Sequence, residues 1–261
     1  METKMIPAIE VHDVTVSYNR KPALWGIDFE VPEGKLVGII GPNGAGKSTM
    51  IKAMMDLNSL DSGYVKLFGK NINEVRDRVA YVPQRGSVDW DFPASVLDVV
   101  LMGRYGKKGL FKRINKADKA MAMECLEKVN MQQYINRQIS QLSGGQQQRV
   151  FIARSLAQEA DLYFMDEPFA GIDATTEKTI FDLLLKMRAE GKTILVVHHD
   201  LQSAYEYFDW IILLNTQLIA SGPKEKIFVP EFLQKTYGGK IDLLTKVGEM
   251  LSELQVPPRE K

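Results

Sequence analysis

Eight consecutive residues fit a phosphate-binding pattern without a mismatch. The pattern G-x-x-x-x-G-K-[ST] is matched by Gly41, Pro42, Asn43, Gly44, Ala45, Gly46, Lys47 and Ser48, and Thr49 follows directly. Its glycines allow backbone dihedrals that turn successive N–H groups inward around an anion. Lys47 can reach the β- and γ-phosphates of a nucleoside triphosphate, and the Ser48 hydroxyl can bind Mg²⁺. The pattern predicts a nucleoside triphosphate site without specifying the base or the work done.

A pair of carboxylates follows a short apolar run. Residues 162–165 (Leu-Tyr-Phe-Met) indicate a buried strand, and Asp166 and Glu167 come directly after it. At such a strand end Asp166 can bind the Mg²⁺ of the nucleotide, and Glu167 can hold or deprotonate an attacking water. The alternative is that Asp166 only caps the following turn while Glu167 is solvated.

A second anion site is predicted where a helix begins. Ser143, Gly144, Gly145 and Gln146 precede a stretch with a continuous apolar helical face that runs to Leu156. Small residues leave the N–H groups of the first turn bare at the positive end of the helix dipole. The chain thus has two predicted phosphate-binding sites that are far apart in the sequence. They could contact the same phosphate if each were contributed by a different subunit.

The elements expected around these residues alternate between strand and helix. Residues 36–40 read as a buried strand before the phosphate loop, and residues 49–55 as a helix after it. Further strands are predicted at 8–18, 24–31, 64–68, 79–82, 193–197, 210–214 and 217–220, and helices at about 95–104, 115–129 and 174–190. This order favours a largely parallel sheet covered on both faces, with a helical insert at about residues 84–158. The apolar spacing after residue 240 predicts a C-terminal helix within residues 241–261.

Composition narrows the class of protein. The chain has 261 residues, of which 45% are hydrophobic and 25% charged, as expected of a globular α/β protein. Its formal net charge of zero provides no global field that would attract nucleic acid or anionic lipid. No apolar run approaches the roughly 18–20 residues that span a bilayer, and the N-terminus lacks a secretion signal. The single cysteine, Cys125, is expected to be a packed thiol in a reducing cytosol.

In this order, residues 41–49, 142–146 and 162–167 resemble the ATP-binding subunit of an ABC transporter, over about residues 8–240. The resemblance implies an α/β fold: a P-loop NTPase (RecA-like) core with an antiparallel β subdomain and an inserted helical subdomain. The ABC ATP-binding domain would span residues 1–240. Tyr18 resembles the aromatic that stacks on adenine, and Gln84 the glutamine that touches Mg²⁺ and the attacking water. Asp173 resembles the aspartate at the dimer seam, and His199 the switch histidine near the γ-phosphate.

The resemblance also implies cofactors and partners. ATP and Mg²⁺ would be bound in a head-to-tail homodimer, each ATP between the Lys47 loop of one copy and Ser143–Gly145 of the other. Mg²⁺ would be held by Ser48, Gln84 and Asp166, with Glu167 as catalytic base and His199 as γ-phosphate sensor. A separate integral membrane permease would hold the subunit at the cytoplasmic face of the cell membrane.

Three segments, residues 84–93, 99–105 and 196–201, resemble the bacterial manganese, zinc and iron importer branch. Manganese is therefore the expected cargo, with zinc or iron next, and a metal-binding extracytoplasmic protein is an indirect partner. Trp90 and Phe92 would either form a socket for a cytoplasmic helix of the permease or fill the core of their own domain.

Other classes fit less well. Residues 115–118 match the guanine-reading pattern N-K-x-D of GTP switches, but no buried strand precedes them, and Asn115 reads as a helix N-cap. A non-transport ABC ATPase acting on DNA or ribosomes would carry a long coiled coil or a second cassette. The segment between Gln84 and Leu142 has no sustained heptads, and the neutral charge disfavours nucleic acid. A non-catalytic ATP-binding module is disfavoured by the presence of Glu167 and His199.

Overall fold

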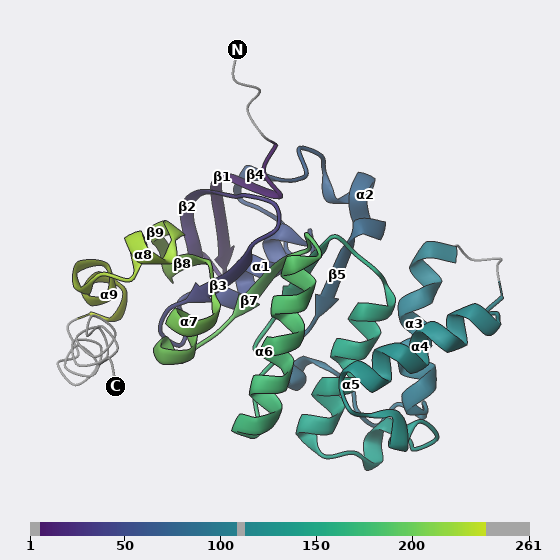
Figure 1. The fold of residues 1–261 in the computed structure, drawn as a ribbon. Helices are drawn as coiled ribbons and strands as arrows, with labels where there is room; N and C mark the ends of the chain where they lie inside the picture. Colours follow the sequence, from purple (N-terminus) through teal and green to yellow (C-terminus); the bar gives the residue numbers. More distant parts are fainter. Residues whose placement is uncertain (1–5, 109–112, 239–261) are drawn as a thin grey trace, which may run out of the picture. The chain divides into compact units, whose positions relative to one another are not determined.

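The computed structural model describes residues 6–108 and 113–238 (Figure 1). It divides into two compact units. Unit 1 comprises the residues up to Val31, Val37–Gly69 and the segment from His198 onward, and unit 2 comprises Pro32–Leu36 and Lys70–Val197. The helix predicted within residues 241–261 lies outside the described residues. Among the helices of the described part, none is long and apolar enough to cross a membrane.

Unit 1 contains an antiparallel sheet with the strand order β2-β1-β4. Its strands are β1 (Ile9–Tyr18), β2 (Lys21–Val31) and β4 (Ser62–Leu67). The alternation that predicted β1 places Val11, Val14 and Val16 in the core. The register slips between Val11 and Val14, where Asp13 has a positive φ of 47°, so β1 contains a bulge that its sequence did not indicate.

The phosphate-loop segment of unit 1 belongs to a second set of strands. Strand β3 (Leu36–Ile40) pairs in parallel with β8 (Trp210–Asn215), which pairs antiparallel with β9 (Gln217–Pro223). Every residue of β3 is buried, which explains its uninterrupted apolar sequence. The helices of unit 1 are α1 (Lys47–Met54), α7 (Leu201–Tyr207), α8 (Lys224–Ile227) and α9 (Pro230–Tyr237).

Unit 2 combines three parallel strands with longer helices. The strands, in the order β5-β6-β7, are β5 (Val79–Val82), β6 (Leu162–Met165) and β7 (Thr193–Val197). The helices are α2 (Ile72–Val75), α3 (Val96–Lys108), α4 (Lys116–Lys128), α5 (Gly144–Ala157) and α6 (Ala174–Ala189). Helix α5 packs against α3 and α4, which forms a helical layer within this unit.

Capping residues set the starts of helices α4 and α6. The Asn115 side chain accepts a hydrogen bond from the Asp118 N–H at 3.0 Å, and the Asp118 carboxylate accepts one from the Asn115 N–H at 2.8 Å. This reciprocal pair is a capping box, so the N-K-x-D match serves the start of α4. Asp173 likewise caps α6 by accepting from the Thr176 N–H.

Candidate nucleotide site

The phosphate loop lies in unit 1 between β3 and α1. The buried side chain of Lys47 returns to the loop, where its Nζ donates to the carbonyl oxygens of Gly41 at 2.8 Å and Pro42 at 2.9 Å. The Met50 N–H donates to the Gly46 carbonyl at 2.8 Å and closes the first turn of α1. The loop therefore holds a lysine amine and a helix N-terminus close together, as the sequence pattern predicts.

Two loop glycines are required for different reasons. Gly46 has a φ of 93°, and a Cβ there would lie 2.5 Å from the Ala23 carbonyl oxygen. Gly41 has no positive φ, but a Cβ there would lie 2.0 Å from the Leu214 carbonyl oxygen. The dihedral argument made from the sequence thus applies to Gly46, whereas Gly41 is needed because β8 approaches it closely.

The two carboxylates lie in unit 2 at the end of β6. Asp166 is 1% exposed, and its N–H donates to the Val82 carbonyl at 2.9 Å. Burial, together with the charge of Asp166, raises the pKa of the Tyr81 hydroxyl to about 12. Glu167 has a φ of 51°, and its Oε2 accepts a hydrogen bond of 2.8 Å from the Gln84 amide. Glu167 is therefore held by a protein partner, which argues against the reading of a merely solvated side chain.

The start of helix α5 has the predicted arrangement of small residues. Ser143 is the N-cap, and its hydroxyl accepts from the Gln146 N–H at 3.4 Å while the Gln146 side chain accepts from the Ser143 N–H at 2.9 Å. A Cβ at Gly145 would meet Ile172 at 3.0 Å, and one at Gly144 would meet the Arg85 guanidinium at 2.7 Å. The close approach of Ile172 and of the Gly171 carbonyl favours glycine at position 145, whereas the flexible Arg85 side chain could move away from a Cβ at position 144.

The smaller predicted site residues are distributed over both units. Tyr18 ends β1 in unit 1, is 49% exposed, and its hydroxyl accepts from the Asn58 amide at 2.8 Å. His199, also in unit 1, is exposed and follows the buried His198. Asp173 lies in unit 2 as the cap of α6. Within unit 2 the structure brings the side chains of Gln84 and Glu167 together. The roles that the resemblance assigns to individual residues stay predictions.

The sequence did not indicate how the loop after Gln84 is fastened to helix α5. The Arg85 Nε donates to Gln147 Oε1 at 3.2 Å, and the Trp90 indole N–H donates to the Arg85 carbonyl at 2.8 Å. The Trp90 ring packs edge-on against Phe151 of α5, with ring centroids 4.8 Å apart. The glutamine loop and the helix that begins at Ser143 therefore form one connected structure.

A small apolar cavity of about 180 Å³ adjoins this loop in unit 2. Trp90, Phe92, Met102 and Phe151 contribute to its wall, together with Asp89, Val99, Ile139 and Arg154. Phe92 is 51% exposed, so it contributes little to the core. Trp90 packs against Phe151 and also lines the cavity, and the role of the pair as a socket for a permease helix stays a prediction.

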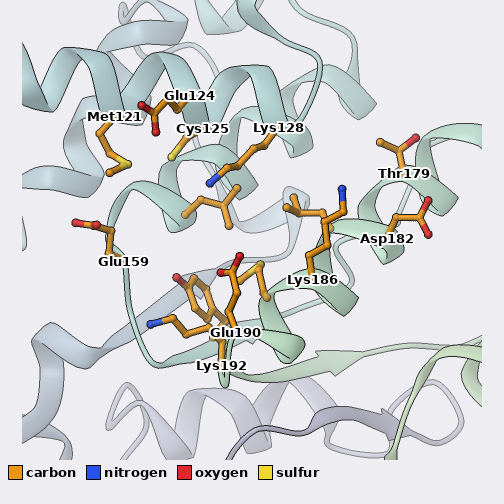
Figure 2. A pocket seen from close by; sticks show the side chains of 14 residues that line it. Met121, Glu124, Cys125, Lys128, Glu159, Thr179, Asp182, Lys186, Glu190 and Lys192 are labelled. Atoms are coloured by element: carbon orange, nitrogen blue, oxygen red, sulfur yellow. The ribbon is translucent and has the colours of Figure 1, made fainter.

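A larger cavity of about 520 Å³ lies among α4, α5, β6 and α6 (Figure 2). Its buried lining includes Cys125, whose thiol pKa is raised to about 11 by burial, as expected for a packed cysteine. The charged side chains around it are of both signs: Glu124 and Lys128 come from α4, and Asp182 and Lys186 from α6 (Figure 2). Mixed charge of this kind selects neither anions nor cations, and the thiol is protonated at neutral pH.

The phosphate loop, its buried lysine and the carboxylates that follow β6 define a P-loop nucleoside triphosphatase. Residues 24–170 match the ABC transporter family. The chain belongs to this family, as an ATP-binding subunit that hydrolyses ATP. The predicted fold class is confirmed, and the GTPase and non-transport alternatives receive no support.

Two curated relatives and one solved structure illustrate the match. The chain is 61% identical to the "Manganese transport system ATP-binding protein MntB" of Bacillus subtilis, over 90% of this chain and 94% of the relative. It is 56% identical to the "Zinc transport system ATP-binding protein TroB" of Treponema pallidum, over 90% and 88%. The dimeric structure of a bacterial ABC transporter cassette superposes with a TM-score of 0.74 at 30% identity, covering 82% of this chain and 98% of that one.

Proposed function

We propose that this subunit powers the uptake of a transition metal ion through a separate membrane permease, with manganese as the first expected cargo and zinc or iron next. The observation that carries the proposal is the near full-length identity of 61% to a manganese-transport subunit and 56% to a zinc-transport subunit. The subunit would lie at the cytoplasmic face of the cell membrane, and a metal-binding extracytoplasmic protein would deliver the ion. No nucleic-acid partner is proposed.

The residues of the site suit Mg·ATP. The buried Asp166 carboxylate, the Ser48 hydroxyl and the Gln84 amide are hard oxygen donors of the kind that Mg²⁺ prefers. When bound, Mg²⁺ would neutralise charge on the phosphate oxygens. Lys47 and the surrounding N–H groups would hold the β- and γ-phosphates, and Tyr18 would stack on the adenine.

Glu167 would act as general base. The Gln84 amide donates to one oxygen of its carboxylate, which orients the side chain. The other oxygen can then accept the proton of an attacking water. His199 would contact the γ-phosphate and report its presence.

The site would be completed by a second copy of the chain. ATP on the Lys47 loop of one copy would meet the N-terminus of α5 in the other, where Ser143–Gly145 begin the helix. Asp173 would lie at the seam between the copies. A dimeric cassette at 30% identity supports this arrangement.

The permease would dock at the loop that carries Gln84. The 180 Å³ cavity offers an apolar recess for a side chain of a cytoplasmic helix, with the exposed Phe92 beside it. Because the same loop holds both α5 and Glu167 by hydrogen bonds, movement of the docked helix would reach the catalytic base directly.

Cargo can be tested by uptake. Cells lacking the subunit should lose accumulation of radioactive manganese and regain it with the intact chain, whereas Lys47→Ala should not restore it. Restoration of zinc but not manganese uptake would reassign the cargo. Restoration of neither metal by an intact, membrane-associated chain would contradict metal import.

Dimerisation is tested separately. Glu167→Gln saturated with Mg·ATP should elute as a dimer in size exclusion with light scattering, and Lys47→Ala should remain monomeric. A Glu167→Gln protein that stays monomeric both alone and with its permease would rule out the shared site.

A further inference from the structure

His198 is a buried polar residue beside an exposed one. His198 is 2% exposed, whereas the next residue, His199, is exposed. The His198 N–H donates to the Ile39 carbonyl in β3 at 3.1 Å, two residues before the phosphate loop begins. Its ring lies edge-on to Phe208 at 5.7 Å, and Phe208 packs so closely on Gly38 that a Cβ there would lie 2.8 Å from its ring. His198 is thus fixed to the strand that leads into the phosphate loop.

A short chain of hydrogen bonds runs from the His198 ring to Asp200. The His198 Nε2 lies 2.7 Å from Ser203 Oγ, and Ser203 Oγ donates to Asp200 Oδ1 at 2.7 Å. The Ser203 N–H also donates to Asp200 Oδ1, at 2.8 Å, which caps α7. Since the Ser203 proton is given to the carboxylate, the hydroxyl must accept from Nε2–H, and this fixes the tautomer of the ring.

His199 is therefore enclosed by two restrained neighbours. His198 precedes it and Asp200 follows it, and Ser203 joins these two side chains. The residues on either side of His199 are thus linked to each other through Ser203, which restrains the backbone that carries its exposed side chain. Packing alone does not explain the arrangement, because an apolar side chain at position 198 would fill the space without the desolvation cost of an imidazole.

We propose that His198, acting through Ser203 and Asp200, is a positioning residue that holds His199 ready for the γ-phosphate. This inference rests on the proposed role of His199 as γ-phosphate sensor. Its physical basis is preorganisation: a side chain whose backbone is already fixed loses less entropy when it engages the transition state.

The test uses Ser203 in the full-length chain. Ser203→Ala removes the link and should lower kcat for ATP hydrolysis about 10-fold, because small misplacements of a catalytic group cost one to two orders of magnitude. KM for ATP should change less than about 2-fold, because the phosphate loop is untouched. The matched control, Ser203→Thr, keeps the hydroxyl and should retain near-normal kcat.

A double-mutant cycle separates positioning from a general structural role. In a His199→Ala background, Ser203→Ala should have no further effect on kcat, because there is no imidazole left to position. Should Ser203→Ala fail to fold, Asp200→Asn replaces it, since asparagine still caps α7 but is a weaker acceptor. Asp200→Asn should lower kcat by a smaller factor than Ser203→Ala. In the His199→Ala background it should likewise leave kcat unchanged.

The possible results distinguish the positioning role of His198 from the sensor role of His199. Additive losses in the cycle, or an unchanged kcat in Ser203→Ala, would overturn the positioning role while leaving the sensor role of His199 intact. Normal turnover of His199→Ala would instead refute the sensor role on which the inference rests.

Discussion

The amide nitrogen of Gln84 lies 2.8 Å from Oε2 of Glu167. The contact joins the loop proposed to face the permease to the proposed catalytic base. Glu167 also has a φ of 51°, a left-handed conformation that costs a non-glycine residue on the order of 1 kcal/mol and persists only where the surroundings enforce it. The position of this carboxylate is therefore set by its neighbours, and it is sensitive to movement of the loop that carries Gln84.

Glu167→Gln should retain ATP binding and lose hydrolysis by about 10² or more, the usual contribution of a general base. The amide keeps the size of the side chain but cannot accept the proton of water. Phosphate release and nucleotide binding, measured on the same preparation, check this. Glu190→Gln, an exposed carboxylate just after α6, is the control and should behave as the unmodified chain. Near-normal turnover in Glu167→Gln would remove this residue from the mechanism.

Gly46→Ala should abolish measurable ATP binding in titration calorimetry. The alanine would require a φ near 93° and would also place its Cβ against the Ala23 carbonyl. Gly191→Ala is the matched control, because Gly191 has a φ of 84° but open space around it. It should cost about 1 kcal/mol of unfolding free energy and leave ATP affinity unchanged. Equal ATP affinity in both variants would contradict the close approach of β2 to the loop.

Trp90→Ala should lose transport and keep the ATPase activity of the free subunit, if the Trp90 cavity receives the permease. Trp90→Phe, which keeps an aromatic ring against Phe151, should lose less. Trp25→Ala is the control, because Trp25 is 57% exposed on β2 and lines no part of this cavity. Transport and free-subunit ATPase falling in parallel would instead indicate that Trp90 only supports its own unit.

Because of His198, the free energy of unfolding should be lower in mild acid than at neutral pH. Burial, followed by the charge of His199, lowers its pKa from 6.5 to about 4, while Asp200 acts in the opposite direction. Between these values the unfolded chain binds a proton that the folded chain does not, so the unfolding free energy falls as pH falls from 6.5 toward 4. The contribution is up to about 3 kcal/mol. Chemical denaturation of His198→Gln should show a flatter pH dependence over this window; an identical slope would contradict the buried, neutral ring.

Local signals explain what could be predicted from the sequence. The phosphate loop, the cap at Asn115 and the apolar strands each depend on residues within a few positions of one another. Helices α2, α7, α8 and α9 were not predicted: each has four to eight residues, and none follows a sequence motif as the equally short α1 follows the phosphate loop.

Contacts between residues that are distant in the sequence explain what could not be predicted. The Gln84–Glu167 and Arg85–Gln147 pairs join residues 83 and 62 positions apart, and no local pattern identifies such partners. Gly41 was assigned to the loop for its dihedral freedom, whereas the close approach of Leu214 is the cause. The Ser203 link was missed for the same reason as the pairs: its hydroxyl reads as an ordinary first-turn residue until the fold brings the imidazole to it.

The hydrogen bonds already present at the two proposed phosphate contacts have a consequence for how two copies would separate. The Lys47 amine donates to two carbonyls of its own loop, so binding phosphate would redirect N–H groups from these carbonyls. The Ser143 hydroxyl accepts from the Gln146 N–H and can keep that bond while it donates its own proton to a phosphate of the other copy. Because an exchange of hydrogen bonds contributes much less free energy than a single bond formed anew, the proposed dimer could form and separate once in each cycle of ATP hydrolysis.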